Sequence, residues 1–104
     1  MFISSTANLA NNGTVTSNLI NTDRIDYIVG YIKTDQAGTL KVQQTSDGGT
    51  NYDIEDSFSV VAGTTKTFSV ALIAAQVRVT FTNTGGSTST YLRLYAKGSS
   101  AGDS

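Results

Sequence analysis

Hydrophobic and polar residues alternate with a period of two along most of the chain, and Gly, Asn and Asp interrupt the alternation. Such a pattern is typical of half-buried β-strands. No window has a sustained helical period, and the apolar run 72–75 fits a corner between strands. We therefore expect an all-β fold: a single antiparallel β-sandwich of about seven strands, either immunoglobulin-like or jelly-roll. The expected strands lie at Thr14–Ile20, Arg24–Thr34, Thr39–Thr45, Phe58–Val60, Thr67–Leu72, Val77–Thr82 and Tyr91–Lys97.

The apolar sides of these strands define the expected core and the extent of the domain. We expect the sandwich domain to occupy residues 13–97, with an N-terminal arm at residues 1–12 and a C-terminal tail at residues 98–104. The arm carries scattered apolar residues, which fits either a frayed terminus or a segment that docks on a partner or on a neighbour's sheet edge. The predicted core consists of inward-facing apolar side chains: Val15, Leu19, Ile28, Ile32, Leu40, Val42, Phe58, Phe68, Val70, Val77, Val79, Phe81, Leu92 and Leu94.

Composition excludes several classes of function. The chain has no His and no Cys, which excludes a catalytic His, a Cys nucleophile, a Cys/His zinc site and disulfides. No apolar run approaches the roughly 20 residues of a membrane span. Seven Lys and Arg with a net charge of −1 do not favour nucleic-acid binding. The first ten residues lack the basic and apolar regions of a secretory signal. We expect a protein made in the cytoplasm that is not an enzyme, needs no cofactor or metal, and binds neither nucleic acid nor membrane.

The segment Thr45–Tyr52 follows the pattern S/T-x-D-x-G-x-x-aromatic and resembles the Asp-box hairpin of sialidases. The resemblance implies that Asp47 caps turn amides, that Gly49 has a positive φ and that Tyr52 packs under the turn. The chain departs from the Asp-box at Asn51 and Tyr52, where Thr and Trp are usual. Because the Asp-box is a structural element, we expect a metal-free turn and no glycosidase site.

The same segment has an alternative interpretation as a calcium site. Asp47, Asn51, Asp53, Glu55 and Asp56 place five oxygen-bearing side chains within ten residues, and calcium prefers oxygen ligands. The spacing differs from that of an EF-hand loop, because Glu55 is the ninth residue counted from Asp47 and not the twelfth. Weak calcium binding near Asp47 stays open at this point.

The stretch Tyr27–Tyr52 resembles a segment of bacteriophage structural proteins. In those proteins a strand ending in S/T-D-Q-A-G-T-L leads into a second strand and a Q-S/T-x-D-G turn. The resemblance implies a small β-sandwich that decorates phage heads or builds head fibres and tail accessories, without catalytic activity. The run Asp35–Gly38 also has the composition of a four-residue hairpin loop with Gly38 in the left-handed position. The residues that carry the resemblance are Gly30, Thr34, Asp35, Gln36, Ala37, Gly38, Thr39, Leu40, Gln44, Thr45, Asp47, Gly48 and Tyr52.

Tyrosines outside the predicted core provide a candidate interface. Tyr27 and Tyr31 lie on one face of a strand that is apolar on both sides, and Tyr91, Arg93 and Tyr95 point away from the predicted core. Tyr and Arg are enriched at the residues that dominate binding energy in protein interfaces. Two interpretations remain open, an ordinary half-exposed sheet face and a contact surface for another protein.

Together these features predict a virion structural protein, in the first place a capsid decoration protein on the outer surface of the head, bound to the major capsid protein. A head-fibre or tail accessory domain and a carbohydrate- or cell-surface-binding β-sandwich are the alternatives. We expect a homo-oligomer, with a trimer favoured because a small cement protein can bridge capsomers at three-fold positions. The expected contact residues are Phe2, Ile3 and Leu9 in the arm and Tyr27, Tyr31, Tyr91, Arg93 and Tyr95 on the strand face.

Overall fold

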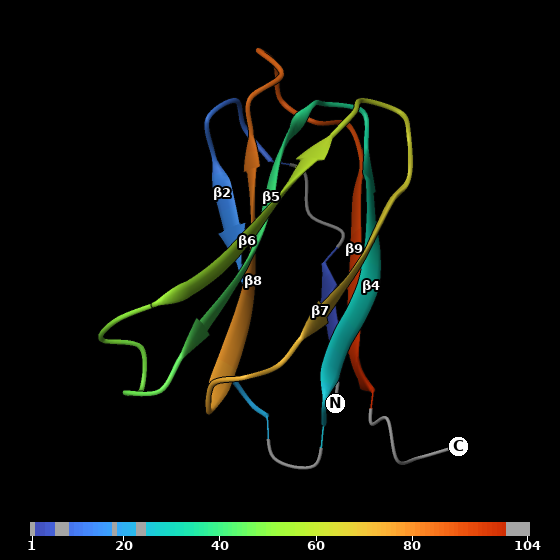
Figure 1. Cartoon of the computed structure of the whole chain (residues 1–104). Coiled ribbons are helices and arrows are strands. Elements are labelled where there is room, and N and C mark those ends of the chain that lie inside the picture. The colour runs from blue at the N-terminus through green and yellow to red at the C-terminus, as the bar shows by residue number, and fades with distance from the viewer. Residues whose placement is uncertain (1, 6–8, 18, 23–24, 100–104) are drawn as a thin grey trace.

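The computed structural model shows two packed antiparallel β-sheets (Figure 1) and describes residues 2–5, 9–17, 19–22 and 25–99. No α-helix occurs among these residues, and none of them forms a helix that could cross a membrane. The all-β sandwich expected from the alternation is therefore confirmed. The nine strands of this part of the chain are β1 (Phe2–Ser5), β2 (Thr14–Thr16), β3 (Ile20–Asn21), β4 (Tyr27–Thr34), β5 (Gly38–Thr45), β6 (Ile54–Val60), β7 (Lys66–Ala71), β8 (Gln76–Asn83) and β9 (Leu92–Ser99).

The order of the strands identifies a jelly roll. One sheet has the order β1-β9-β4-β7, and the other has the order β2-β8-β5-β6, with β3 also paired to β8. The pairing is nested: β1 pairs with β9, β2 and β3 with β8, β4 with β7, and β5 with β6. If β2 and β3 are taken as one interrupted strand, the eight strands form the two four-stranded sheets of a jelly roll. The choice that the sequence left open is thereby resolved against the immunoglobulin-like connectivity.

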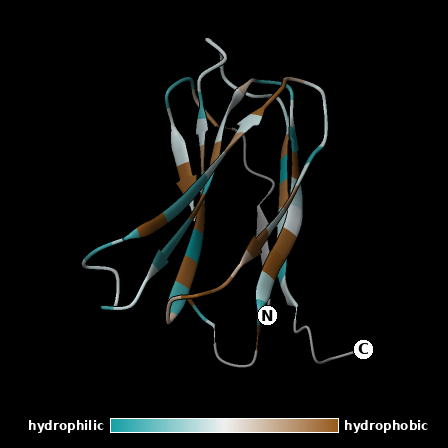
Figure 2. Cartoon of the chain, viewed as in Figure 1, coloured by the Kyte–Doolittle hydropathy of each residue, from teal (hydrophilic) through white to brown (hydrophobic). Residues whose placement is uncertain are grey.

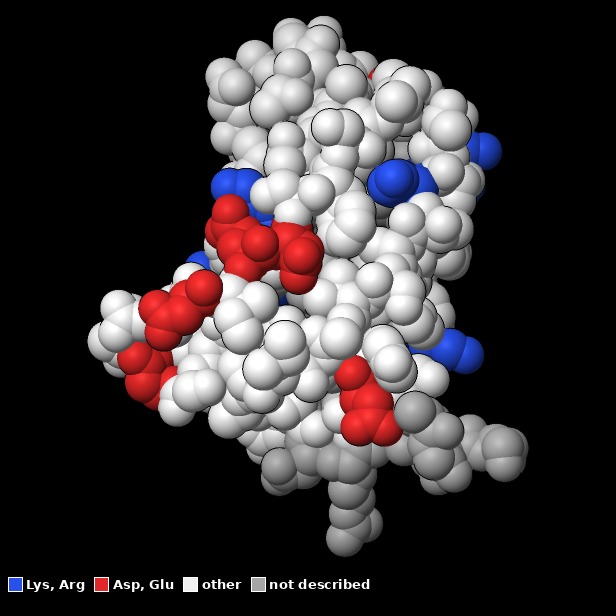
Figure 3. All heavy atoms as spheres, in the orientation of Figure 1, with Lys and Arg blue, Asp and Glu red and all other residues white. Residues whose placement is uncertain are grey.

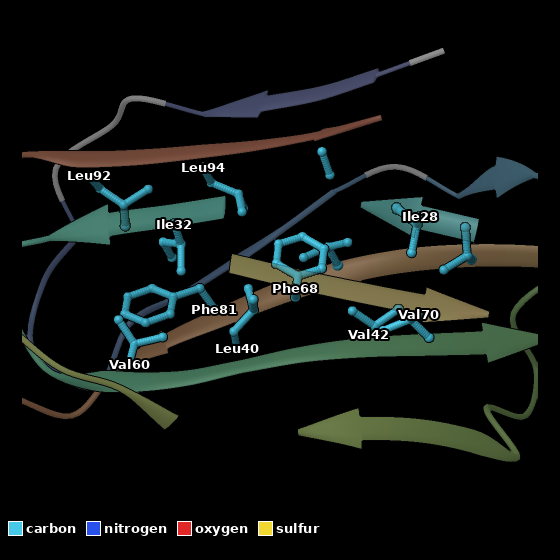
Figure 4. Close-up of a cluster of buried hydrophobic side chains, with 13 residues drawn as sticks. Ile28, Ile32, Leu40, Val42, Val60, Phe68, Val70, Phe81, Leu92 and Leu94 are labelled. Atoms are coloured by element: carbon cyan, nitrogen blue, oxygen red, sulfur yellow. The ribbon is translucent and has the colours of Figure 1, made fainter. Parts of the chain in front are cut away.

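The core lies between the two sheets, and Figure 4 shows side chains from both sheets meeting there. Ile28, Ile32, Leu40, Val77 and Phe81 are completely buried. All residues of the predicted core are buried except three. Two of these, Val15 on β2 and Phe58 on β6, are half-buried and pack against the cluster. Burial of a Val, Leu, Ile or Phe side chain stabilises a protein by about 1.5–3 kcal/mol, so this cluster is the main source of stability. The buried cluster also includes two residues outside the prediction: Val60 and Ala96.

The third exception is Leu19, which was predicted in the core but lies outside the buried cluster. Its neighbour Ile20 packs against the cluster instead. The reason is a one-residue offset along β8: Val15 pairs with Phe81 and Ile20 pairs with Val77, so five positions on one side face four on the other. An extra residue of this kind reverses which side chains face the core, as in a β-bulge. The single strand expected at 14–20 is therefore two short strands.

Two segments that we expected to lie outside the sandwich are part of it. Phe2–Ser5, placed by prediction in a separate arm, forms β1 and pairs with β9 of the same chain. Gly98 and Ser99, placed in the tail, extend β9 alongside β4. Residues 1, 6–8 and 100–104 of the expected arm and tail lie outside the described residues. β9 thus runs two residues further toward the C-terminus than the side-chain pattern indicated, and it also pairs with a strand from the N-terminal segment.

The run Asp35–Gly38 is not a hairpin loop, as its composition suggested. It joins β4 in one sheet to β5 in the other, so it is a crossover between sheets. Gly38 lies in β5 and is not among the glycines with positive φ. A Cβ at this position would lie 2.5 Å from the ring of Phe81 and would also meet the carbonyl of Thr82. Glycine is required here for space between two strands rather than for a left-handed backbone.

Candidate interaction surface

The outer face of β4 and β9 carries the exposed tyrosines, and we call this surface the tyrosine face; it consists of Tyr27, Val29, Tyr31, Lys33, Arg93, Tyr95 and Lys97. β4 and β9 are adjacent antiparallel strands, so residues about 60 positions apart in sequence become neighbours. Along β4 and β9, buried residues alternate with exposed or partly exposed ones. Figure 2 shows hydrophobic and hydrophilic bands on the strands of the sandwich. The two tyrosine stripes predicted from the sequence therefore form one surface.

Tyr31 and Tyr95 are the centre of the tyrosine face. They are directly paired across the two strands, and their ring centroids lie 6.1 Å apart with the planes tilted by 33°. Their exposed fractions are 39% and 37%, and that of Tyr27 is 41%. Rings in this arrangement support each other while leaving one side open to solvent. Contact with another protein would remove this remaining apolar surface from water.

Gly30 allows the two strands to approach closely enough for this pairing. A Cβ at Gly30 would lie 2.8 Å from the Cα of Ala96 and would also meet the carbonyl group of Tyr95. Both are backbone atoms, which cannot move aside as the end of a flexible side chain can. Any side chain at position 30 must therefore push β9 away from β4.

The position of β4 accounts for only half of its two-sided apolar pattern. β4 lies between β9 and β7, so its inward residues Ile28 and Ile32 are buried in the sandwich. Its outward tyrosines, Tyr27 and Tyr31, stay 41% and 39% exposed. Packing within the single chain therefore accounts for the apolar residues on the inner side of β4 but not for those on its outer side.

The charge of the tyrosine face is positive. Lys33, Arg93 and Lys97 project from it, and no Asp or Glu occurs in the described strands of this sheet. Lys33 and Arg93 are directly paired. In Figure 3 some basic side chains project from the right-hand margin, where β4 lies in Figure 1, and most acidic side chains gather on the left around β6, next to further basic ones. One acidic side chain lies at the lower right.

Tyr91 and Arg93 extend the face at one end of β9. The Arg93 guanidinium lies 5.1 Å from the centre of the Tyr91 ring, within the range of a cation–π contact. The adjacent backbone is fixed by Asp35, which accepts hydrogen bonds from the Thr90 hydroxyl (2.6 Å) and the Thr90 amide (2.9 Å). The hydroxyl hydrogen bond is the main reason why the pKa of Asp35 is lowered. This end of the tyrosine face is thereby held in one conformation.

Leu9 was expected to contact a partner, but it packs half-buried against the protein's own core. Its amide donates to the Ser89 hydroxyl at 2.7 Å, and its carbonyl accepts from the Asn83 side chain at 2.9 Å. These bonds hold its backbone in place, so Leu9 is not part of an exposed arm. The side chains of Phe2 and Ile3 lie outside the described part of the structure.

The turn between β5 and β6 is built around Asp47. Its carboxylate accepts hydrogen bonds from the Thr45 hydroxyl (2.7 Å), the Asn51 amide (2.9 Å) and the Asn51 side chain (2.8 Å). The Asn51 amide is the largest cause of a pKa of about 2 for Asp47. Gly49 has a φ of 101°, and the Arg78 guanidinium lies 3.8 Å from the centre of the Tyr52 ring. Within the described residues, no group of three or more acidic side chains could hold a metal ion.

A groove of about 460 Å³ opens between the outer strands of the two sheets, β6 and β7. Gln44 closes its inner end, because the Gln44 side chain accepts from the Ile73 amide (2.7 Å) and donates to the Ala71 carbonyl (3.0 Å). Sequence reasoning missed both the groove and the role of this buried glutamine. The residues that line the groove are Gln44, Ile54, Asp56, Phe58, Ser69, Val70, Ala71 and Ile73.

Sequence reasoning also missed the separation of charge, although a signal was present. The chain has no acidic residue from position 57 to position 99 and none from 27 to 34, whereas four acidic residues fall between positions 47 and 56. The two stretches without acidic residues contain β4, β7 and β9, which are strands of the sheet that carries the tyrosine face.

Solved structures with a similar fold include the crystal structure of PBSX exported protein XepA, with a TM-score of 0.83 and 16% sequence identity. The match covers 98% of this chain and 38% of XepA, so the chain spans less than half the length of that protein. A second similar structure comes from Bacillus endospore appendages, described as a novel family of disulfide-linked pili. It has a TM-score of 0.51 and 15% identity, and the match covers 95% of this chain and 89% of the other. At these identities the likeness shows the fold alone.

A comparison with curated proteins finds no match. A comparison with protein families matches residues 1–99 to the family described as the uncharacterised protein YqxG N-terminal domain. Because this match spans nearly the whole chain, the chain belongs to the YqxG N-terminal domain family.

Proposed function

We propose that this chain is a non-enzymatic structural module of a virion, in the first place a decoration protein on the outer surface of a phage head. The observation that carries the proposal is the tyrosine face, a broad sheet surface with three exposed tyrosines and three cations that the fold leaves uncovered. Tyr and Arg have the properties of binding-energy hot spots, since they bury much apolar area and still form polar contacts. Such a face is suited to binding a protein surface.

Two further observations support an assembly role. The stretch Tyr27–Tyr52 resembles phage structural proteins, and one neighbour in fold is described as an exported protein and the other as a pilus protein. A jelly roll is also a common architecture of viral capsid domains. The chain has no Cys, so its contacts with neighbours would be non-covalent, unlike those of disulfide-linked pili. The major capsid protein as partner and the trimer stay predictions.

The test uses particles released by cells that carry this gene. Mass spectrometry of gradient-purified particles should find the chain, and gold-labelled antibody should mark the heads. Particles stripped of the chain should rebind the purified protein. The double variant Tyr31→Ala/Tyr95→Ala should rebind at least about tenfold more weakly, because truncating interface tyrosines commonly costs more than 1 kcal/mol each.

The matched control is Ile73→Ala, which removes an exposed apolar side chain (76% exposed) that is not part of the tyrosine face. It should rebind as the wild type does. Absence of the chain from purified particles would overturn the virion role. Label on tails instead of heads would favour a tail accessory domain. Unchanged rebinding by the double variant would remove the tyrosine face from the proposal.

A further inference from the structure

We propose that the tyrosine face binds the acidic edge of a second copy of this chain, so that copies associate head to tail. The acidic edge is formed by Asp53, directly before β6, and by Glu55 and Asp56 at the beginning of β6. The inference rests on the proposed function, because it names a partner for the same face. The argument for this contact is that the two surfaces carry opposite charges and lie apart in the fold of one chain.

The acidic edge is accessible. Asp53, Glu55 and Asp56 are all exposed, and in the described structure β6 pairs only with β5, so its other edge is open. Within β6 the two acidic residues point to opposite sides, Glu55 to the outer face and Asp56 to the side of the groove. Inward-pointing charge on an outer strand prevents another strand from simply extending the sheet. A partner that carries cations on a sheet face can contact this edge without adding a strand.

The charges on both surfaces are largely uncompensated within the chain. Glu55 has a partner, since Lys41 lies 3.6 Å from it and the Gln43 side chain donates to it at 2.7 Å. Asp53 and Asp56 have no cationic partner among the described residues. On the tyrosine face, Lys33, Arg93 and Lys97 have no acidic partner in the described part of the chain either.

The two surfaces cannot meet within one molecule. The tyrosine face lies on the outer surface of the sheet β1-β9-β4-β7, whereas β6 is the outermost strand of the other sheet. In Figure 3 most acidic side chains lie around β6 on the left, whereas some of the basic side chains project at the right-hand margin. Opposite charges on separate surfaces of one molecule attract different copies to each other, and like-charged surfaces repel, which selects the head-to-tail arrangement.

A contact between two different patches is heterologous. Such contacts close into a ring when the rotation between copies allows it, and otherwise extend into a fibre. A ring of three would agree with the trimer expected for a decoration protein, and an open arrangement would agree with a head fibre. The rotation between neighbouring copies decides whether a ring or a fibre forms.

The size of the face indicates a weak contact. The whole outer surface of the sheet that carries the face is an upper bound: eight residues at about 3.3 Å each give a length of about 26 Å, and four strands about 4.8 Å apart give a width of about 15–19 Å. The resulting 400–500 Å², roughly, is below the approximately 800 Å² that each partner contributes to a stable interface. We therefore expect association only at high protein concentration, and suppression of it by salt.

The test is sedimentation velocity of the purified chain from about 10 μM to 1 mM protein, in 50 mM and in 500 mM NaCl. The wild type should associate at the highest concentrations in 50 mM NaCl and much less in 500 mM. The face-reversed variant Arg93→Glu/Lys97→Glu and the edge-reversed variant Asp53→Lys/Asp56→Lys should each be monomeric. An equimolar mixture of the two should associate, because each then offers a surface complementary to the other.

The control is Ser87→Glu/Thr88→Glu, which adds two negative charges to an exposed loop that belongs to neither surface. It should associate as the wild type does. If a reversed variant fails to fold by circular dichroism, Arg93→Gln/Lys97→Gln and Asp53→Asn/Asp56→Asn replace the pair, and each should reduce association.

A wild type that stays monomeric at 1 mM in 50 mM NaCl overturns the inference, as does association that survives both reversals or a mixture that stays monomeric. These measurements need no particles. A monomeric chain that still labels phage heads would therefore reject the head-to-tail contact and leave the virion role intact.

Discussion

Replacement of Gln44 by Leu tests whether one buried side chain holds the two sheets together at a corner. Gln44 is 1% exposed and lies at the end of β5, opposite the corner that leads from β7 in one sheet to β8 in the other. Its amide nitrogen donates to the Ala71 carbonyl at 3.0 Å. Its oxygen accepts from the Ile73 amide at 2.7 Å and the Ala74 amide at 3.1 Å. Leu has a similar size but can form none of these bonds.

The expected cost follows from the count of bonds lost. Each intramolecular hydrogen bond contributes about 1 kcal/mol net, and a buried group left without a partner costs about 1–3 kcal/mol. Ile73 is exposed, so water can reach part of the corner. We therefore take the lower value for all three bonds and expect Gln44→Leu to lower the free energy of unfolding by about 3 kcal/mol. That is a large fraction of the roughly 5–15 kcal/mol typical of a domain.

The matched control is Gln43→Leu, on the neighbouring position of the same strand. The Gln43 side chain donates to Glu55 and accepts from Arg78, both at 2.7 Å, but on the outer face, where water can replace these partners. Its replacement should cost less than about 1 kcal/mol. Urea unfolding should show a clear fall of the midpoint for Gln44→Leu with an unchanged m-value. Hydrogen exchange should show faster exchange of the Ile73 and Ala74 amides. Equal stability of the two variants would refute the reasoning.

Two further predictions concern the turn and the tyrosine face. Asp47 has a pKa of about 2, below its ordinary 3.8, because the Asn51 amide and the Thr45 hydroxyl bind the charged form. Its contribution to stability is therefore complete above about pH 4 and is lost as the pH falls toward 2. Thermal unfolding of Asp47→Ala should depend less on pH in that window than the wild type, and EDTA should leave the melting temperature unchanged; a lowered melting temperature would instead support calcium. Gly30→Ala should lower the free energy of unfolding by at least about 1–3 kcal/mol, because the added Cβ meets the backbone of β9. Urea unfolding measures this change, and a variant as stable as the wild type would show that the two strands can separate freely.

The strands and most of the core could be predicted because side-chain alternation is a local property of the sequence. Val77, Val79 and Phe81 point inward in any sheet that buries one face of their strand. The exchange of Leu19 for Ile20 could not be predicted, because it depends on the register against β8. The strand β1 escaped prediction for a similar reason, since four residues carry too little pattern and are fixed by pairing with β9.

The candidate surface was predictable in its parts but not as a whole. Tyr31 and Tyr95 could each be assigned to an outward strand face from the sequence. Their contact depends on the pairing of β4 with β9, which are separated by about 60 residues. Likewise, Asp35–Gly38 has turn chemistry in a hairpin and in a crossover alike, so composition could not distinguish the two. Long-range topology decides both features.

The nested pairing of the strands also determines the order in which the chain can fold. Only β5 and β6 are close neighbours in sequence, so their hairpin, closed by the turn at Asp47, is the pair with the smallest loop-closure entropy. Each further pair encloses the previous one, and β1 with β9 joins the two ends of the chain. Folds dominated by such distant pairings fold in milliseconds to seconds. On the ribosome the last pair must wait for β9 to emerge, so the tyrosine face, built on β9, would be the last surface of this sandwich to form.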